Sequence, residues 1–233
     1  MLPLRDVNPV SKPPLMTRAL LLANVALFMP VLWAFVTGDQ AFYASLMRSL
    51  GLVPGEVLAM RNLYSFITCM FVHADLLHIM GNMLYLHIFG DNVEDVLGRA
   101  RFLAFYLSCG LVASLSHILV CSLTGMGLDV PVVGASGAIS GILGAYMIFF
   151  PRARILTLIM GYRGLPVQIR AVYYILGWFA YQVIWALAAL SLGLQVSVAF
   201  WAHIGGFLAG LSLGYLLKEE ARTRAEERSW IGW

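Results

Sequence analysis

Four polar residues that lie in otherwise apolar segments could together carry out acyl transfer. Ser136 lies in GASG, His203 lies in AHIGGFLAG, and His78 and Asn82 are four residues apart in HADLLHIMGN. A serine hydroxyl is a weak nucleophile until a base takes its proton, and a neutral histidine is the usual base near pH 7. We therefore consider His203 the candidate base for Ser136.

The negative oxygen of a tetrahedral intermediate requires hydrogen-bond donors that are already in place. Asn82 offers an amide NH₂ group and His78 a ring N–H, and their four-residue spacing puts both on one face of a helix. The backbone N–H of Ser136 is a further candidate, because the first four N–H groups of a helix lack internal partners. No carboxylate falls at the same depth, so we expect a Ser–His dyad without a third member.

Each of these residues also has a purely structural interpretation. Gly137 and Gly141, like Gly206 and Gly210, form small-xxx-small patterns that let membrane helices touch, and isolated polar side chains can join helices by hydrogen bonds. The two interpretations need not exclude each other. Glycines that draw two spans together would also bring the polar residues of those spans together.

A metal site could be built only from His73, His78 and His203. The chain has no HExxH or other compact ligand spacing, and no carboxylate at that depth. We expect neither a metal nor an organic cofactor, and no contact with nucleic acid. The three cysteines, Cys69, Cys109 and Cys121, are odd in number and form no pair with a motif-like spacing. This argues against a disulfide framework and favours packing roles.

Membrane spans must position these residues. The chain has 233 residues, of which 61% are hydrophobic and 12% are charged, whereas soluble domains carry about 25% charged residues. A helix that crosses about 30 Å of hydrocarbon needs roughly 20 apolar residues. Six segments qualify or come close, which predicts an all-α polytopic bundle: Met16–Val36, Leu76–Val96, Arg99–Leu123, Val132–Phe150, Arg170–Leu192 and Val196–Leu217.

The distribution of Lys and Arg predicts the orientation of the bundle. With six spans both termini share one side, which holds 13 of the 15 Lys and Arg residues, while only Arg48 and Arg61 lie on the other. This bias indicates cytoplasmic termini. The segment 38–75 is then external, and its apolar stretches AFYASLMRSLGLV and LYSFITCMFVHAD are too short to span, which predicts short helices in the outer interface.

The predicted spans place the four polar residues in one layer. At 1.5 Å per residue, Ser136 lies roughly 6 Å and His203 roughly 10 Å below the outer ends of their spans. His78 lies near the outer end of its span, and Asn82 follows one turn further in. We expect these side chains to line a cavity that opens to the outer face and admits water.

The sequence resembles the rhomboid family of intramembrane serine proteases through four motifs in the expected order. The family's GxSx motif is matched by GASG, its AHxxGxxxG motif by AHIGGFLAG, and its HxxxxHxxxN pattern by HADLLHIMGN. A further pattern, GxxxExxxGxxxF, is matched by Gly90, Glu94, Gly98 and Phe102. The resemblance covers nearly the whole chain from the first span to the last.

The resemblance implies a single domain over residues 1–233, with six membrane helices, a membrane-embedded first loop and short cytoplasmic tails. It assigns Ser136 as nucleophile and His203 as base, and His78, Asn82 and the Ser136 backbone N–H to the oxyanion site. The implied substrates are membrane-spanning proteins in the same lipid bilayer, cut at or near the outer ends of their helices. Size and resemblance together predict a bacterial inner-membrane protein, with its substrate and oligomeric state unspecified.

Two positions depart from the family pattern. Some members carry an aromatic residue four positions after the serine, where it stacks on the histidine; here that position is Ser140, so another group must hold the His203 ring. The family's Trp-Arg pair in the first loop is Met60-Arg61 here, which leaves the anchoring of that loop open.

Two other functions remain as alternatives to proteolysis. A non-catalytic chaperone of the same family would bind membrane proteins without cutting them, although relatives of that kind lack the serine or the histidine. A transporter could use buried histidines as a proton relay. A serine-directed covalent probe would separate both from a protease.

Overall fold

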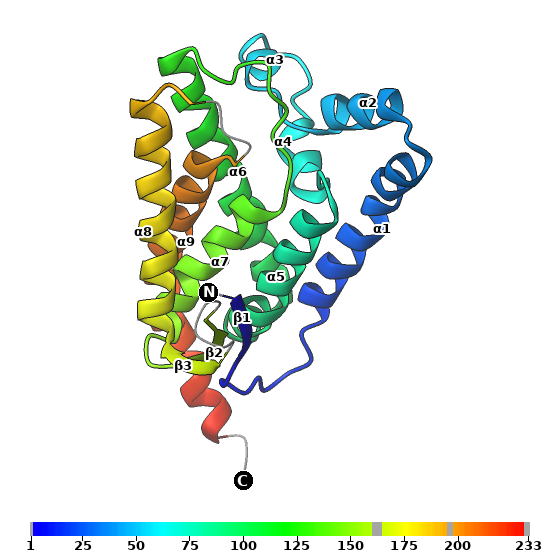
Figure 1. Ribbon diagram of the computed structural model, residues 1–233. Coiled ribbons are helices and arrows are strands. Elements are labelled where there is room, and N and C mark those ends of the chain that lie inside the picture. The colour runs from blue at the N-terminus through cyan, green and yellow to red at the C-terminus, as the bar shows by residue number, and fades with distance from the viewer. Residues whose placement is uncertain (1, 160–164, 195–197, 231–233) are drawn as a thin grey trace.

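Six helices form the bundle of the computed structural model, which describes residues 2–159, 165–194 and 198–230 (Figure 1). They are α1 (Leu15–Thr37), α5 (Leu76–Leu97), α6 (Arg99–Thr124), α7 (Ser136–Phe149), α8 (Ala171–Ser191) and α9 (Phe200–Trp230). These helices correspond to the six predicted segments. The prediction of a helical, polytopic membrane protein is therefore confirmed.

The six helices differ in how well they could cross a bilayer. By length and composition, α1, α6, α8 and α9 qualify alone, and α5 qualifies together with Ser65–Phe71, from which it is bent by 93°. Helix α7 has 14 residues, or about 21 Å at 1.5 Å per residue, which is less than the hydrocarbon thickness. In Figure 1 it begins partway down the bundle, below the upper ends of α6 and α8.

The segment before α7 is extended where the sequence predicted helix from Val132. The backbone groups of Val132 and Leu52 exchange two hydrogen bonds of 2.8 and 2.9 Å, and Gly134 has a φ of +121° that only glycine adopts readily. Ser136 is consequently the first residue of α7 rather than the fifth residue of a longer helix. The extended segment lets a short helix begin inside the bundle.

The first loop folds into short helices at one end of the bundle, as predicted. They are α2 (Gln40–Leu50), α3 (Pro54–Leu58), α4 (Ser65–Thr68) and the single 3₁₀ turn η1 (Cys69–Phe71). Glu56 holds the loop together by accepting hydrogen bonds from Arg48, at 2.7 Å, and from the Asn62 side chain. Thr68 donates a further bond of 2.7 Å to the Leu50 carbonyl. These contacts hold the segments of the loop together.

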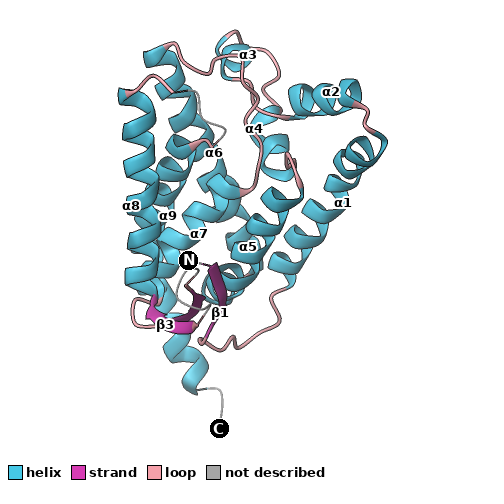
Figure 2. Ribbon diagram, viewed as in Figure 1, coloured by secondary structure: helices cyan, strands magenta, loops and turns pink. Residues whose placement is uncertain are grey.

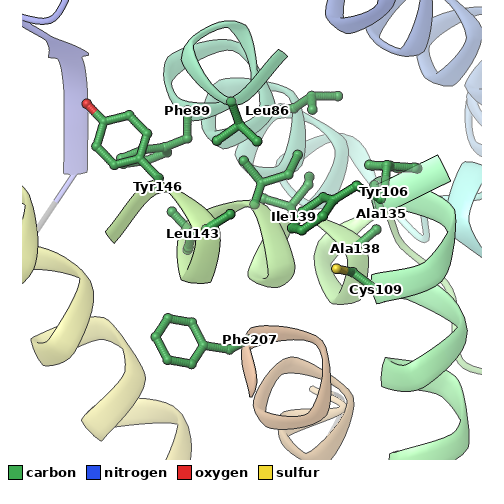
Figure 3. Close-up of a cluster of buried hydrophobic side chains, with 14 of the residues drawn as sticks. Leu86, Phe89, Tyr106, Cys109, Ala135, Ala138, Ile139, Leu143, Tyr146 and Phe207 are labelled. Atoms are coloured by element: carbon green, nitrogen blue, oxygen red, sulfur yellow. The ribbon is translucent and has the colours of Figure 1, made fainter. Parts of the chain in front are cut away.

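Helix α7 lies at the centre of the apolar core, where α5, α6 and α9 surround it (Figure 3). Phe89 of α5 and Tyr106 of α6 are almost fully buried and point towards it, while the buried Phe207 of α9 directs its ring towards α8. Helices α7 and α9 approach each other most closely where glycines face each other. A Cβ on Gly206 would meet the carbonyl oxygen of Gly137 at less than contact distance, so the small-residue pattern does make the two backbones touch.

Glu94 has a structural role that the motif pattern alone did not reveal. Its carboxyl oxygens accept hydrogen bonds from the backbone N–H groups of Met16 and Thr17, at 2.9 and 2.7 Å, and from the Thr17 hydroxyl at 2.8 Å. Glu94 thereby caps the N-terminus of α1, whose first N–H groups have no helical partners. Gly90, one turn earlier, leaves room for the Thr17 methyl group.

The structure also contains a three-stranded antiparallel sheet that the all-α prediction missed. It consists of β1 (Leu2–Asp6), β2 (Arg154–Leu158) and β3 (Pro166–Arg170), in the order β1-β2-β3. Figure 2 shows β1 and β3 at the end of the bundle opposite α2 and α3. β1 and β2 are separated by most of the chain, so their pairing leaves no signal in the local sequence.

Candidate active site

The serine and histidine singled out from the sequence lie within hydrogen-bond distance. Ser136 Oγ at the start of α7 is 2.8 Å from Nε2 of His203 in the first turns of α9. The two residues are 67 positions apart, and the glycine contacts between α7 and α9 bring their backbones together. A neutral imidazole at this distance can accept the hydroxyl proton.

The second ring nitrogen of His203 has a partner that the sequence reading did not find. His203 Nδ1 is 2.8 Å from Oε1 of Gln182, which lies in the middle of α8 and is 4% exposed. The sequence did contain a signal for this residue. Gln182 is an isolated amide within an apolar span, and such groups are costly in hydrocarbon. The sequence predicted a Ser–His dyad without a third member, whereas the structure places a neutral amide in the third position.

The Ser140 hydroxyl donates a 2.6 Å hydrogen bond to the Ser136 carbonyl. The aromatic neighbour of His203 is instead Trp178 of α8, at a ring-centroid distance of 6.1 Å and an interplanar angle of 37°. Trp178 and Gln182 are one helical turn apart. Both therefore approach the histidine from the same face of α8.

His78 lies beside the extended segment that precedes Ser136, residues 132–135 (the serine loop), and directs one ring nitrogen at it. The Ala74 backbone N–H donates to Nδ1 at 3.4 Å, which leaves the proton of the neutral ring on Nε2. A Cβ on Gly134 would lie 2.6 Å from Nε2 of His78 and 3.6 Å from Oγ of Ser136. Glycine at position 134 thus allows an N–H donor and the serine hydroxyl to flank the same space.

Asn82 lines the same cavity, although one of its hydrogen bonds stays within its own helix. Its Nδ2 donates to the His78 carbonyl at 2.8 Å, and its buried Oδ1 has no partner among the described residues. His73 supports the serine loop, because its Nε2 accepts a 3.4 Å bond from the Ala135 backbone N–H and its ring packs edge-on against His78.

A cavity of about 880 Å³ connects these groups. Its lining includes the four polar side chains predicted to share one layer, His78, Asn82, Ser136 and His203, and also Ser140. Most other lining residues are apolar and come from α5, α6, α8 and the loop before α7. Among the residues that the structure describes, no group of three His, Cys, Asp or Glu side chains could hold a metal ion.

A bundle of helices long and apolar enough to span a membrane, with a serine, a histidine and nearby N–H donors in one cavity, defines a polytopic membrane protein with a polar site inside its bundle. A family model described as the Rhomboid domain matches residues 60–220. The chain belongs to the rhomboid family.

Individual relatives agree with this assignment. The chain is 30% identical over 166 residues to "Rhomboid protein 1, mitochondrial" of Saccharomyces cerevisiae, which covers 70% of this chain and 44% of the relative. It is 30% identical over 173 residues to "RHOMBOID-like protein 7" of Arabidopsis thaliana, covering 74% of this chain and 49% of the relative. The chain thus matches about half the length of these curated relatives.

Proposed function

We propose that this protein is an intramembrane serine protease that hydrolyses peptide bonds in other membrane proteins. The observation that carries the proposal is the 2.8 Å contact between Ser136 Oγ and His203 Nε2 inside a cavity that also holds His78 and Asn82. A purely structural hydrogen bond would not need an adjacent cavity of this size, nor a glycine that exposes the serine to a second N–H donor.

In the proposed reaction, Ser136 Oγ attacks the carbonyl carbon of the scissile bond while its proton passes to His203 Nε2. The oxyanion that forms accepts hydrogen bonds from the His78 Nε2–H, the Asn82 amide and the Ser136 backbone N–H. Collapse of the intermediate breaks the C–N bond, and His203 returns the proton to the departing amine. A water molecule, deprotonated by His203, then attacks the carbonyl carbon of the acyl-enzyme. The bond to Ser136 Oγ breaks, His203 returns the proton to Ser136 Oγ, and the product leaves with its new carboxylate.

The substrate class follows from the surroundings of the cavity. Its walls are helices of the membrane bundle, so a polypeptide that reaches Ser136 must come from the bilayer or from its surface. A helical peptide bond is shielded by its own hydrogen bonds, and we expect substrates with helix-weakening residues near the cut. From the Lys and Arg distribution we infer cytoplasmic termini and a site open to the outer face.

The proposal is tested with the full chain, a membrane-spanning reporter and a fluorophosphonate probe. Ser136→Ala and His203→Ala should reduce reporter cleavage to background and abolish probe labelling. Ser122→Ala, at an exposed position of α6, is the matched control and should behave as wild type. Undiminished cleavage by the Ser136 variant would end the proposal, and an unlabelled wild type that retains intact membrane proteins would favour the chaperone alternative.

A further inference from the structure

We infer that Gln182 is a positioning residue that fixes the tautomer and ring orientation of His203, and so substitutes for a triad carboxylate. This inference rests on the proposed function. Its basis is the 2.8 Å contact between Gln182 Oε1 and His203 Nδ1, opposite the 2.8 Å contact of Nε2 with Ser136 Oγ.

The chemistry of the proposed base requires one particular tautomer. A neutral imidazole carries its proton on one nitrogen only, and Nε2 can accept the serine proton only when the ring proton lies on Nδ1. An acceptor at Nδ1 selects that form. The amide oxygen of Gln182 is such an acceptor, and it remains a partner when the ring becomes doubly protonated during the reaction.

The surroundings of Gln182 make this contact specific. The side chain is 4% exposed and lies in an otherwise apolar helix, where an unpaired amide would be strongly unfavourable. Ser140 occupies the position of the family's stacking aromatic and bonds to the Ser136 carbonyl instead. On the α8 side, the His203 ring has two neighbours: Gln182, which contacts Nδ1, and Trp178, whose indole lies near the ring.

Gln182 and Trp178 both belong to α8, so the orientation of the His203 ring depends on the position of that helix. The packing of α8 on α9 is continued by Phe179, whose ring stacks on Phe207 at a centroid distance of 4.4 Å. An outward displacement of α8 would remove the acceptor from Nδ1 and the indole from the ring together. The base is then correctly oriented only while α8 packs against α9.

Gln182→Met tests the inference, because it preserves length and apolar packing but removes the acceptor. Loss of the acceptor leaves a buried N–H unpaired, so we expect kcat to fall about 10- to 100-fold while KM changes less than about twofold. Ile184→Met, at an exposed position of the same helix, is the matched control and should retain wild-type kcat. Thermal unfolding of each variant shows whether the fold is kept.

Gln182→Glu separates an acceptor role from a merely structural hydrogen bond. A carboxylate also accepts from Nδ1–H and stabilises the protonated ring, so this variant should recover activity relative to Gln182→Met, with the acid limb of its pH–rate profile moved to higher pH. If the Gln182 contact is only structural, the substitutions should change the melting temperature and leave the pH–rate profile unchanged. Equal kcat and identical profiles in wild type, Gln182→Met and Gln182→Glu would overturn the inference.

A spectroscopic measurement distinguishes failure of this inference from failure of the proposed function. In ¹⁵N-histidine-labelled Ser136→Ala protein, the His203 signals, assigned by comparison with His203→Ala, should show the Nδ1–H tautomer, and Gln182→Met should convert them to a mixture. That result supports the positioning role even if wild type cleaves no reporter. An unchanged tautomer in Gln182→Met refutes the role while leaving the serine protease proposal intact.

Discussion

Gly210 of α9 packs directly against the backbone of Gly141 in α7, closer than any side chain would allow. The same contact recurs one turn earlier between Gly206 and Gly137. Helices in a bilayer gain little from hydrophobic burial against each other, so close backbone packing is a principal source of their association. These two contacts also set the distance between the serine of α7 and the histidine of α9.

Gly206→Ala should separate α7 from α9 and impair the site. The added Cβ would overlap the Gly137 carbonyl oxygen, and backbone atoms cannot move aside as a flexible side chain can. We expect a loss of stability of about 1–3 kcal/mol and a lower kcat, measured by thermal unfolding and reporter cleavage. Gly177→Ala, where nothing lies within 4 Å of the added atom, is the control. Equal behaviour of the two variants would contradict the packing argument.

Gly134→Ala should reduce activity more than it reduces stability. The residue has a φ of +121°, and its Cβ would lie 2.6 Å from His78 Nε2, so the substitution both strains the loop and displaces the proposed oxyanion donor. Removal of one such donor costs about 10²–10³ in kcat in other enzymes, and we expect a loss of that order. Gly81→Ala, on an open face of α5, should leave kcat unchanged. Wild-type kcat in Gly134→Ala would exclude His78 as a donor.

Asp6 should make the docking of β1 dependent on pH. The pKa of the Asp6 carboxyl is raised from 3.8 to about 6, chiefly by burial and also by the negative charge of Asp91, against hydrogen bonds from Tyr146 and Asn92 that lower it. The folded protein therefore binds the proton more tightly than the unfolded chain. The contribution of Asp6 to stability is greatest below about pH 4, falls as the pH rises to about 6, and is constant above.

Asp6→Asn isolates this contribution, because an amide oxygen can still accept the 2.8 Å bond from the Tyr146 hydroxyl but carries no charge. The melting temperature of Asp6→Asn minus that of wild type should rise from pH 4 to pH 6 and then stay constant. Hydrogen exchange of the β1 amides over the same range provides a local readout. A difference that does not vary with pH would show that Asp6 does not titrate in this range.

Glu94→Ala should destabilise the start of α1 more than Glu94→Gln. Alanine removes all three acceptor contacts to Met16 and Thr17, whereas glutamine retains one oxygen in the same place. Loss of a helix cap costs about 0.5–2 kcal/mol, and buried donors left unpaired cost about 1–3 kcal/mol. We expect a loss of about 2–4 kcal/mol for alanine and less for glutamine, measured by denaturant unfolding. Equal stability of both variants would contradict a capping role.

The sequence by itself determined the class of protein and the residues with reactive groups. Hydropathy located the helices because the bilayer admits only long apolar segments whose backbone groups are paired internally. Polar residues in those segments are expensive and few, so Ser136, His203, His78 and Asn82 stood out, and counting residues along each span placed them in one layer. Local rules were sufficient for the first two steps, whereas the depth of Ser136 was counted from a helix start at Val132 that the structure does not have.

The tertiary structure decided what depends on contacts between distant segments. Whether Val132 continues a helix or pairs with Leu52 is a competition between local and long-range hydrogen bonds, and the pairing decided where α7 begins and how Ser136 is presented. The pairing of β1 with β2 likewise has no local signature. Gln182 reaches His203 only because α8 packs against α9 in one rotation and register, and side-chain packing across the whole bundle fixes that arrangement.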